Sequence, residues 1–140
     1  MDRNVYINLG TRDLDKAKAF FIGLGFTLDP RFTNSLSACI VIDLNIFVML
    51  VGEGYLKTFT PKQIVDAHKG TECTIALTFS SKERVDELVE RALAMGATEN
   101  RVPQMQEDPL MYGRSINDFD GHVWEFIWMD PAFAPKHHVL

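Results

Sequence analysis

The order of predicted elements occurs twice in this 140-residue chain, and this repeat constrains the fold more than any other feature. The run VYINL at 5–9 alternates between two faces and is followed by a helical pattern that ends near Gly25. The run CTIALTF at 73–79 alternates in the same way and is followed by a helical pattern that ends near Gly96. Alternation is typical of a half-buried strand, and a glycine after helical spacing is typical of a helix end. The two glycines lie 71 residues apart, which is longer than the repeat of a solenoid protein.

Each helical pattern is followed by three runs that resemble strands. They are FTLDPRF at 26–32, LSACIVIDL at 36–44 and IFVMLV at 46–51 in the first half, and TENRV at 98–102, MYGRSIND at 111–118 and HVWEFIWM at 122–129 in the second. Both halves therefore have the order β-α-β-β-β. We predict an α+β fold in which two tandem β-α-β-β-β modules form a curled mixed sheet around a cavity, with a helix on the outer face of each module.

The halves are predicted to belong to a single domain at 1–140. Module one is expected at about 4–52, an inserted helix at about 55–70, module two at about 72–130 and a tail at 131–140. Thr60, Pro61 and Gln63 match an N-cap, a first-turn proline and a capping-box partner, which predicts a helix that ends at Gly70. This helix is either a connector or a lid over the cavity. For the second module's helix, Ser80 and Glu83 match a capping box.

Charge and hydropathy exclude some classes of partner. The net charge is −5, with 14 basic and 19 acidic residues spread along the chain, so no basic stripe is available to bind nucleic acid. No apolar run approaches the ~20 residues that span a bilayer, and the N-terminus lacks a signal-peptide pattern. Cys39 and Cys73 lie in apolar runs, which predicts buried thiols. We expect a cytoplasmic protein with neither a nucleic-acid nor a membrane partner.

Two segments carry a resemblance to a known family. NLGTRDLDKAKAFFIGLGF at 8–26 and YGRSINDFDGHVWEF at 112–126, joined by the tandem element order, resemble the vicinal-oxygen-chelate superfamily. That superfamily includes glyoxalase I, bleomycin-resistance proteins, fosfomycin-resistance enzymes and extradiol dioxygenases. The resemblance covers nearly the whole chain. It implies a cavity for a small molecule, lined by the first and last strands of each module.

The same resemblance implies four ligand positions, which in metal-dependent relatives hold the metal. Tyr6, Met49, Thr74 and Glu125 occupy them here. The first and third are commonly histidine in those relatives, whereas the second and fourth are commonly glutamate or another oxygen ligand. Of the four residues, only Glu125 is a good metal ligand. Because a catalytic metal generally needs three protein ligands, we predict no cofactor. The alternative is a divalent metal held by Glu125 together with a neighbour such as Asn8, or with a second subunit.

Strand parity gives the inward-facing residues by an independent route. Tyr6 is out of phase with Ile7 and Leu9, and Glu125 is out of phase with Trp124 and Phe126. The predicted cavity lining is Tyr6, Asn8, Phe47, Met49, Thr74, Ala76 and Glu125.

Glu125 is the predicted catalytic residue. A glutamate among apolar neighbours loses solvation, which disfavours its charged form and suits proton transfer. Its alternative role is structural, as a carboxylate that accepts a hydrogen bond from Tyr6 or Thr74 across the cavity.

Arg114 is a further candidate ligand-binding residue. An arginine beside an apolar pocket binds the carboxylate or phosphate of a ligand through its forked N–H groups. The parity of its strand is ambiguous, however, so a surface role is the alternative. Tyr112 on the same strand has the same ambiguity.

These features lead to two hypotheses. The first is a glyoxalase- and bleomycin-resistance-like homodimer that binds a small organic molecule in its cavity without the family's usual metal. The second is a glyoxalase-like lyase or isomerase in which Glu125 is the proton-transfer group or a metal ligand.

Overall fold

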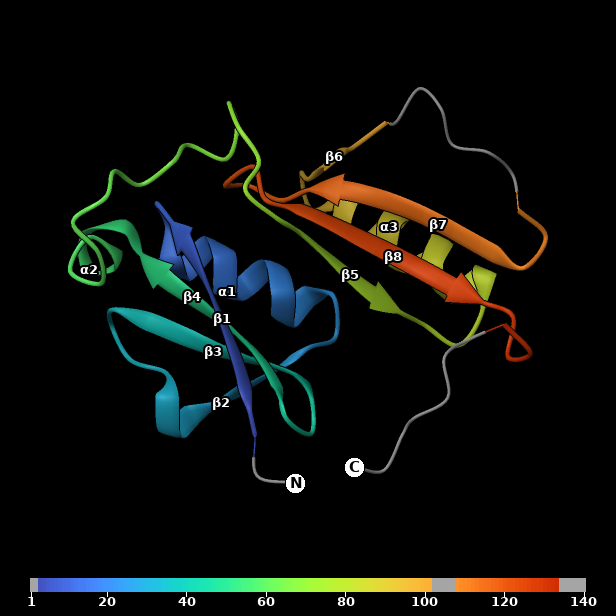
Figure 1. Cartoon of the computed structure of the whole chain (residues 1–140), viewed down its shortest axis with the longest axis horizontal. Helices are drawn as coiled ribbons and strands as arrows, with labels where there is room; N and C mark the ends of the chain where they lie inside the picture. Colours follow the sequence, from blue (N-terminus) through green and yellow to red (C-terminus); the bar gives the residue numbers. More distant parts are fainter. Residues whose placement is uncertain (1–2, 102–107, 134–140) are drawn as a thin grey trace. The chain divides into compact units, whose positions relative to one another are not determined.

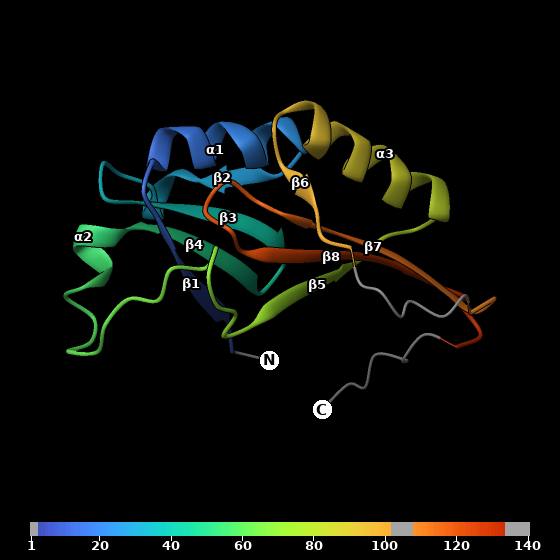
Figure 2. The same cartoon turned by 90° about the horizontal axis from the view of Figure 1, so that it is seen from above.

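The chain folds into two compact units, Met1–Gly70 and Thr71–Leu140, each of which contains one predicted module (Figure 1). The structure is a computed structural model that describes residues 3–101 and 108–133. The predicted α+β class and the two modules are confirmed, and the described strands form one four-stranded mixed sheet in each unit. Figure 2 shows that each sheet has a helix along one of its faces.

The N-terminal sheet has the strand order β1-β4-β3-β2. Its elements are β1 (Val5–Thr11), α1 (Leu14–Gly23), β2 (Thr27–Asp29), the 3-10 helix η1 (Pro30–Phe32), β3 (Ser37–Asp43) and β4 (Ile46–Gly52), with the short helix α2 (Glu53–Leu56) after it. The pairing of β1 with β4 is parallel, whereas β4 with β3 and β3 with β2 are antiparallel.

The C-terminal sheet has the equivalent order β5-β8-β7-β6. Its elements are β5 (Thr74–Thr78), α3 (Lys82–Ala94), β6 (Thr98–Glu99), β7 (Met111–Asn117) and β8 (Val123–Met129). The pairing of β5 with β8 is parallel and the other pairings are antiparallel, as in the first module. The predicted strand at 98–102 is therefore observed at 98–99, and its last residue lies outside the described residues.

Both long helices begin at a side-chain cap and end before a glycine. The Asp13 carboxylate accepts a hydrogen bond from the Lys16 backbone N–H at 3.1 Å, and the Ser81 hydroxyl accepts one from that of Arg84 at 3.0 Å. The predicted cap at Ser80 is therefore wrong by one residue. Gly25 and Gly96 have φ of 98° and 108°, a left-handed conformation that glycine adopts at low cost, so the predicted helix ends are confirmed.

The core of each module lies between its helix and its sheet. Val85, Leu88, Val89 and Ala92 of α3 are buried as predicted, and Trp124 and Phe126 of β8 lie on the same side of the sheet. In the first module, the buried residues of α1 are Ala17, Phe20 and Phe21, and those of the sheet include Ile40, Val48 and Leu50. Each described helix is too short or too polar to span a lipid bilayer.

The predicted helix from Thr60 to Gly70 is wrong. After α2, the chain forms turns, because side chains satisfy the backbone donors locally. The Thr60 hydroxyl accepts a hydrogen bond from the backbone N–H of Lys62, two residues on, at 3.2 Å. The Asp66 carboxylate accepts one from that of His68 at 2.9 Å. The hydroxyl is thus part of a turn and does not cap a helix.

Candidate functional site

The face of the N-terminal sheet opposite α1, which we call the N-terminal helix-free face, brings together four of the predicted site residues. Tyr6 of β1 pairs with Phe47 of β4, and Asn8 pairs with Met49. The Tyr6 and Phe47 rings are stacked, with centroids 4.8 Å apart and an interplanar angle of 13°. The alternation of exposed and buried residues along β4 agrees with the predicted parity, since Val48 and Leu50 are buried on the helix side.

The corresponding C-terminal helix-free face carries Thr74, Ala76 and Glu125. Ala76 of β5 pairs with Glu125 of β8, and Ser115 of β7 lies opposite Glu125 on the other side. The Glu125 side chain is half-buried, and its carboxylate has no hydrogen-bond or salt-bridge partner within 3–101 and 108–133.

The two parallel strand pairs have the same register. Asn8, two residues after Tyr6, pairs with Met49, and Ala76, two residues after Thr74, pairs with Glu125. Met49 in the first module therefore occupies the position that Glu125 occupies in the second. Strand pairing thus supports the assignment of Met49 as the equivalent of Glu125, which the uniformly apolar sequence of its strand leaves ambiguous.

The residues at the four implied ligand positions do not fit a divalent metal ion. Glu125 offers a carboxylate, whereas the phenol of Tyr6, the thioether of Met49 and the hydroxyl of Thr74 are poor ligands for the divalent ions that such sites hold. Within the part of the chain that the structure describes, no group of three or more His, Cys, Asp or Glu residues is placed to hold a metal. The side chains on these faces are better suited to contact an organic molecule directly.

Arg114 lies on the other side of the C-terminal sheet, next to α3. Its guanidinium donates hydrogen bonds to Asp86 at 3.1 Å, Glu90 at 2.9 Å and Glu99 at 3.1 Å. Burial lowers the pKa of Arg114, but the hydrogen bonds to these carboxylates outweigh burial and raise it above its usual value. The Tyr112 hydroxyl donates to Asp86 on the same side. The structure therefore separates Arg114 and Tyr112 from Glu125, and neither belongs to the candidate site.

Arg31 and Phe32 lie beside the N-terminal helix-free face, and the sequence analysis missed both. The run at 26–32 was expected to be one strand, but β2 ends at Asp29 and η1 begins at Pro30. The Phe32 ring lies edge-on to that of Tyr6, with centroids 6.2 Å apart. The signal that indicates this turn is the Asp-Pro pair, since an aspartate before proline favours the start of a turn.

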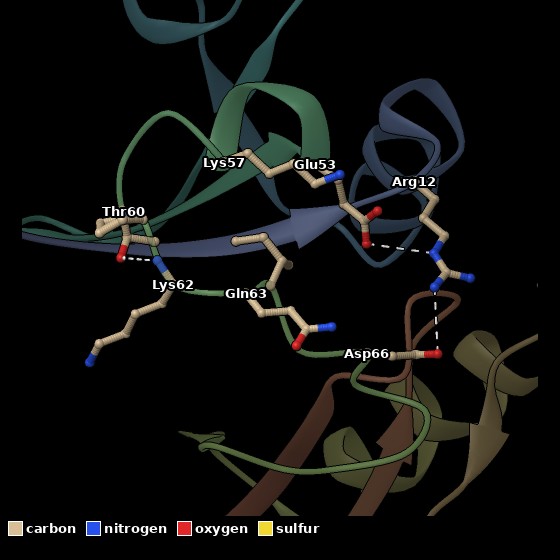
Figure 3. A pocket seen from close by; sticks show the side chains of 9 residues that line it. Arg12, Glu53, Lys57, Thr60, Lys62, Gln63 and Asp66 are labelled. Atoms are coloured by element: carbon tan, nitrogen blue, oxygen red, sulfur yellow. Dashed lines mark hydrogen bonds and ion pairs between the residues drawn. The ribbon is translucent and has the colours of Figure 1, made fainter.

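A separate pocket of about 440 Å³ lies at the other end of β1, between the strand end, α2 and the turns that follow (Figure 3). The Arg12 guanidinium reaches Glu53 and Asp66, each at 3.5 Å, and so ties the turns to α2. Figure 3 shows this guanidinium between the two carboxylates, while the Lys62 side chain extends away from Gln63. The charges are mixed, and the ion pairs of Arg12 anchor this segment to its own module.

The cysteines differ in environment. Cys39 is fully buried in β3, and burial, followed by the charge of Asp29, raises the pKa of its thiol. Cys73 is exposed immediately before β5, so the prediction that both are buried is wrong for Cys73. Both thiols are free.

One family model matches most of the chain. The model of the Glyoxalase/Bleomycin resistance protein/Dioxygenase superfamily matches residues 3–126. A structure of hypothetical protein SA1046 from S. aureus is 25% identical, with a TM-score of 0.76, and the match covers 91% of this chain and 95% of that one. A glyoxalase/bleomycin resistance protein/dioxygenase family enzyme from Burkholderia phytofirmans PsJN is 21% identical, with a TM-score of 0.70 and coverage of 89% and 96%.

The solved structures similar to this chain also include the genomically encoded fosfomycin resistance protein FosX from Listeria monocytogenes. It is 20% identical, with a TM-score of 0.63, and the match covers 97% of this chain and 96% of that one. A mutant of FosX has been solved in complex with Mn(II) and 1S,2S-dihydroxypropylphosphonic acid. None of the curated protein sequences matches this chain.

Proposed function

Because this chain belongs to the Glyoxalase/Bleomycin resistance protein/Dioxygenase superfamily, we propose that it binds a small organic molecule on a helix-free face without a metal ion. The observation that carries the proposal is the half-buried Glu125 carboxylate, which has no partner among the described residues. Its position opposite Ser115 and Ala76 leaves it beside small side chains. A carboxylate in this setting accepts hydrogen bonds from a ligand's N–H or O–H groups.

The two helix-free faces offer a ligand different chemistry. On the N-terminal face, Tyr6 and Phe47 provide an aromatic surface and Asn8 provides an amide. On the C-terminal face, Thr74 provides a hydroxyl and Glu125 a carboxylate. Ligand sites in proteins commonly combine an apolar surface with a few polar groups that orient the ligand. The N-terminal face has this combination on its own, which supports a binding role there.

A second candidate function is a lyase or isomerase of the glyoxalase type. The same carboxylate favours it, because a half-buried glutamate without a partner among the described residues is able to take a proton from a bound substrate and return it. In this reaction Glu125 is the general base. The first candidate function predicts binding without turnover, whereas the second predicts binding with turnover, and this difference separates them.

The test begins with a thermal-shift screen of small metabolites and thiol adducts, followed by calorimetry and activity assays of each hit. The variant is Glu125→Gln, which keeps the shape and removes the ionisable group. We expect affinity or turnover to fall by about tenfold or more, since a hydrogen bond to a charged group contributes ~1.5–3 kcal/mol. Glu72→Gln, which removes an exposed carboxylate before β5, is the matched control and is expected to have no effect. Equal binding and turnover by wild type and Glu125→Gln at every pH would overturn the proposal.

The metal-free part of the proposal has its own test. Protein purified without chelator or affinity-tag metal is expected to contain far less than one equivalent of zinc, nickel, iron or manganese by elemental analysis. One tightly held ion per chain, lost in Glu125→Gln, would contradict this part of the proposal and favour the metal-dependent lyase.

We also propose that the protein is a homodimer, because symmetric dimers are the commonest closed assembly of soluble chains. Several large apolar side chains of the N-terminal unit outside the helix-free face are exposed, including Leu44, Phe59 and Val65. Light scattering over a range of concentrations is expected to give the mass of two chains. A constant mass of one chain would contradict the dimer.

A further inference from the structure

The turn after β2 fixes Arg31 and Phe32 beside the N-terminal helix-free face. The Asp29 carboxylate accepts a hydrogen bond from the Arg31 backbone N–H at 3.0 Å. The Thr33 hydroxyl donates to the Asp29 carbonyl at 2.8 Å and accepts from the Cys39 backbone N–H at 3.1 Å. These bonds join both ends of η1 to β2 and β3, so the two side chains are held by a closed turn.

The Arg31 guanidinium is held by a carboxylate but remains largely exposed. Its Nε and Nη2 atoms donate to the two Asp29 oxygens at 3.1 and 2.8 Å. The Asp29 side chain is 9% exposed, whereas the Arg31 side chain is 77% exposed. A guanidinium has five N–H donors, and this bidentate pair uses two of them. The outer edge of Arg31 therefore presents donors in a fixed orientation.

An aromatic surface continues from this guanidinium across the sheet. The Arg31 Cζ atom lies 5.5 Å from the centroid of the Phe32 ring, and the Phe32 ring lies 6.2 Å from that of Tyr6. Tyr6 in turn stacks on Phe47 at 4.8 Å. Tyr6 and Phe32 are 42% and 46% exposed, so the surface is accessible. A cation over one of two accessible rings that meet edge-on suits a ligand that is both flat and anionic, since the ligand's ring stacks on one of them and lies edge-on to the other.

We infer that the N-terminal helix-free face binds a planar aromatic monocarboxylate, with its ring on Tyr6 and Phe32 and its carboxylate on the outer edge of Arg31. This inference rests on the proposed function and names the class of ligand for that face. A single negative charge is favoured over a dianion, because Asp29 already balances the charge of Arg31. Stacking and a bidentate pair, and not a strong electric field, then provide the affinity.

The test uses 2-naphthoate with two comparison compounds, naphthalene-2-carboxamide, which lacks the charge, and cyclohexanecarboxylate, which lacks the aromatic ring. Calorimetry on the 140-residue chain is expected to show that 2-naphthoate binds about tenfold or more tightly than the amide, which is the size of effect that one bidentate charged contact supplies. It is expected to bind roughly several-fold more tightly than cyclohexanecarboxylate, because stacking adds to the burial of apolar surface.

Variants assign each part of the preference to a residue. Arg31→Gln is expected to abolish the preference for 2-naphthoate over its amide, and Tyr6→Leu to weaken both aromatic compounds while the preference for the charged one remains. Because Arg31→Gln also breaks the pair with Asp29, Arg31→Lys is the second variant: it keeps the charge but loses the fork, and is expected to reduce the preference partly. Arg91→Gln is the matched control, since Arg91 also pairs with a carboxylate, Glu87, at 2.6 Å on α3.

Several outcomes overturn the inference. Equal affinity of wild type for 2-naphthoate and its amide would do so, as would a preference that survives in Arg31→Gln. If another compound binds through Glu125 while none of these three binds, the ligand class is wrong and the proposed function stands. If no compound binds at all, both fall.

Discussion

The two modules share a strand order and a register but present different chemistry on their helix-free faces. Where the first module has Tyr6 and Met49, the second has Thr74 and Glu125. The helix sides of both sheets carry most of the buried apolar residues, with Arg114 and Tyr112 as polar exceptions in the second module, and they fix which residues point inward. The opposite faces are not constrained by packing against a helix. A repeated backbone therefore supplies one aromatic surface and one surface with a carboxylate.

The helices of the two modules differ in a second way. Aligning Gly25 with Gly96 places Ala17 against Leu88 and Phe21 against Ala92, and all four side chains are buried. The large residue thus lies one turn later in α1 than in α3. Each helix contributes one large and one small side chain at this pair of positions. The two side chains of α1 therefore fill a volume similar to that of the two side chains of α3, although the large one is at a different position.

The largest expected effect tests this difference in packing. Phe21→Ala is expected to lower the free energy of unfolding by about 3–5 kcal/mol, because it leaves a cavity under α1. Ala92→Phe, at the equivalent position, adds volume to a filled site and is expected to lower it by about 1–3 kcal/mol. Urea unfolding measures both. If Ala92→Phe left the free energy of unfolding unchanged, the second module would have room for a large side chain at this position. The large and small side chains at the two helix positions would then not compensate for each other.

A smaller effect is expected at the helix ends. Gly96→Ala places a side chain in a left-handed conformation, with the new Cβ 3.2 Å from Phe119, and is expected to cost about 1–2 kcal/mol. Gly25→Ala has a similar φ and is the matched variant in the first module. Thermal unfolding compares them. A Gly25→Ala loss larger than that of Gly96→Ala would show that Phe119 moves aside readily.

Exchange of the matched pair on the helix-free faces is expected to have an effect that is similar for one variant and smaller for the other. Met49→Glu puts a carboxylate beside Cys39 and is expected to lower the free energy of unfolding by about 1–2 kcal/mol. Glu125→Met removes a half-buried charge and is expected to change it by less than about 1 kcal/mol. Chemical denaturation tests both variants. A large loss in Glu125→Met would mean that Glu125 is a structural residue.

The smallest effects concern pH, and they have opposite signs in the two modules. Hydrogen bonds from Arg31 hold the pKa of Asp29 below its usual value. Burial raises the pKa of Asp118, although the Trp124 indole N–H donates a hydrogen bond to the Asp118 carboxylate. The stabilisation that Asp29 provides is therefore present above its ordinary pKa of about 3.9 and is lost as pH falls through the lower folded value. For Asp118, stability is lost as pH rises from that ordinary value through the higher folded value.

Unfolding of Asp29→Asn and Asp118→Asn between about pH 3 and pH 7 tests these signs. Relative to wild type, Asp29→Asn is expected to lose less stability on acidification, and Asp118→Asn to lose less stability as pH rises. Parallel curves for a variant and wild type would mean that the carboxylate it replaces has the same pKa in the folded and unfolded chain.

Much of the fold was predictable because it depends on short-range patterns. Alternation in β1 and β5 identified the faces of Tyr6 and Thr74, and glycines marked the helix ends. The turns after α2 were not predicted, because Thr60 is as compatible with a turn as with a cap. Whether a turn or a helix forms here depends on whether the following residues pack against another element, which the local sequence does not specify.

The candidate site was predictable only in part, for a similar reason. The residues on strands followed from parity, but Arg31 lies on η1, where no periodicity applies. The side of the sheet on which Arg114 lies depends on its pairing with Phe126 in β8 and on the acidic residues of α3. Those contacts join distant parts of the sequence, so a guanidinium that is exposed beside the helix-free face and one that pairs with a helix look alike in the sequence.

The parallel pairing of β1 with β4, and of β5 with β8, implies an order of folding within each module. The antiparallel hairpins β3–β4 and β7–β8 close short loops, whereas β1 and β5 must wait for a distant strand before they gain any backbone partner. We therefore expect each hairpin to form early and each first strand to join its sheet late. The residues that begin each helix-free face, Tyr6 and Thr74, are then placed at the last step, after the surface that receives them has formed.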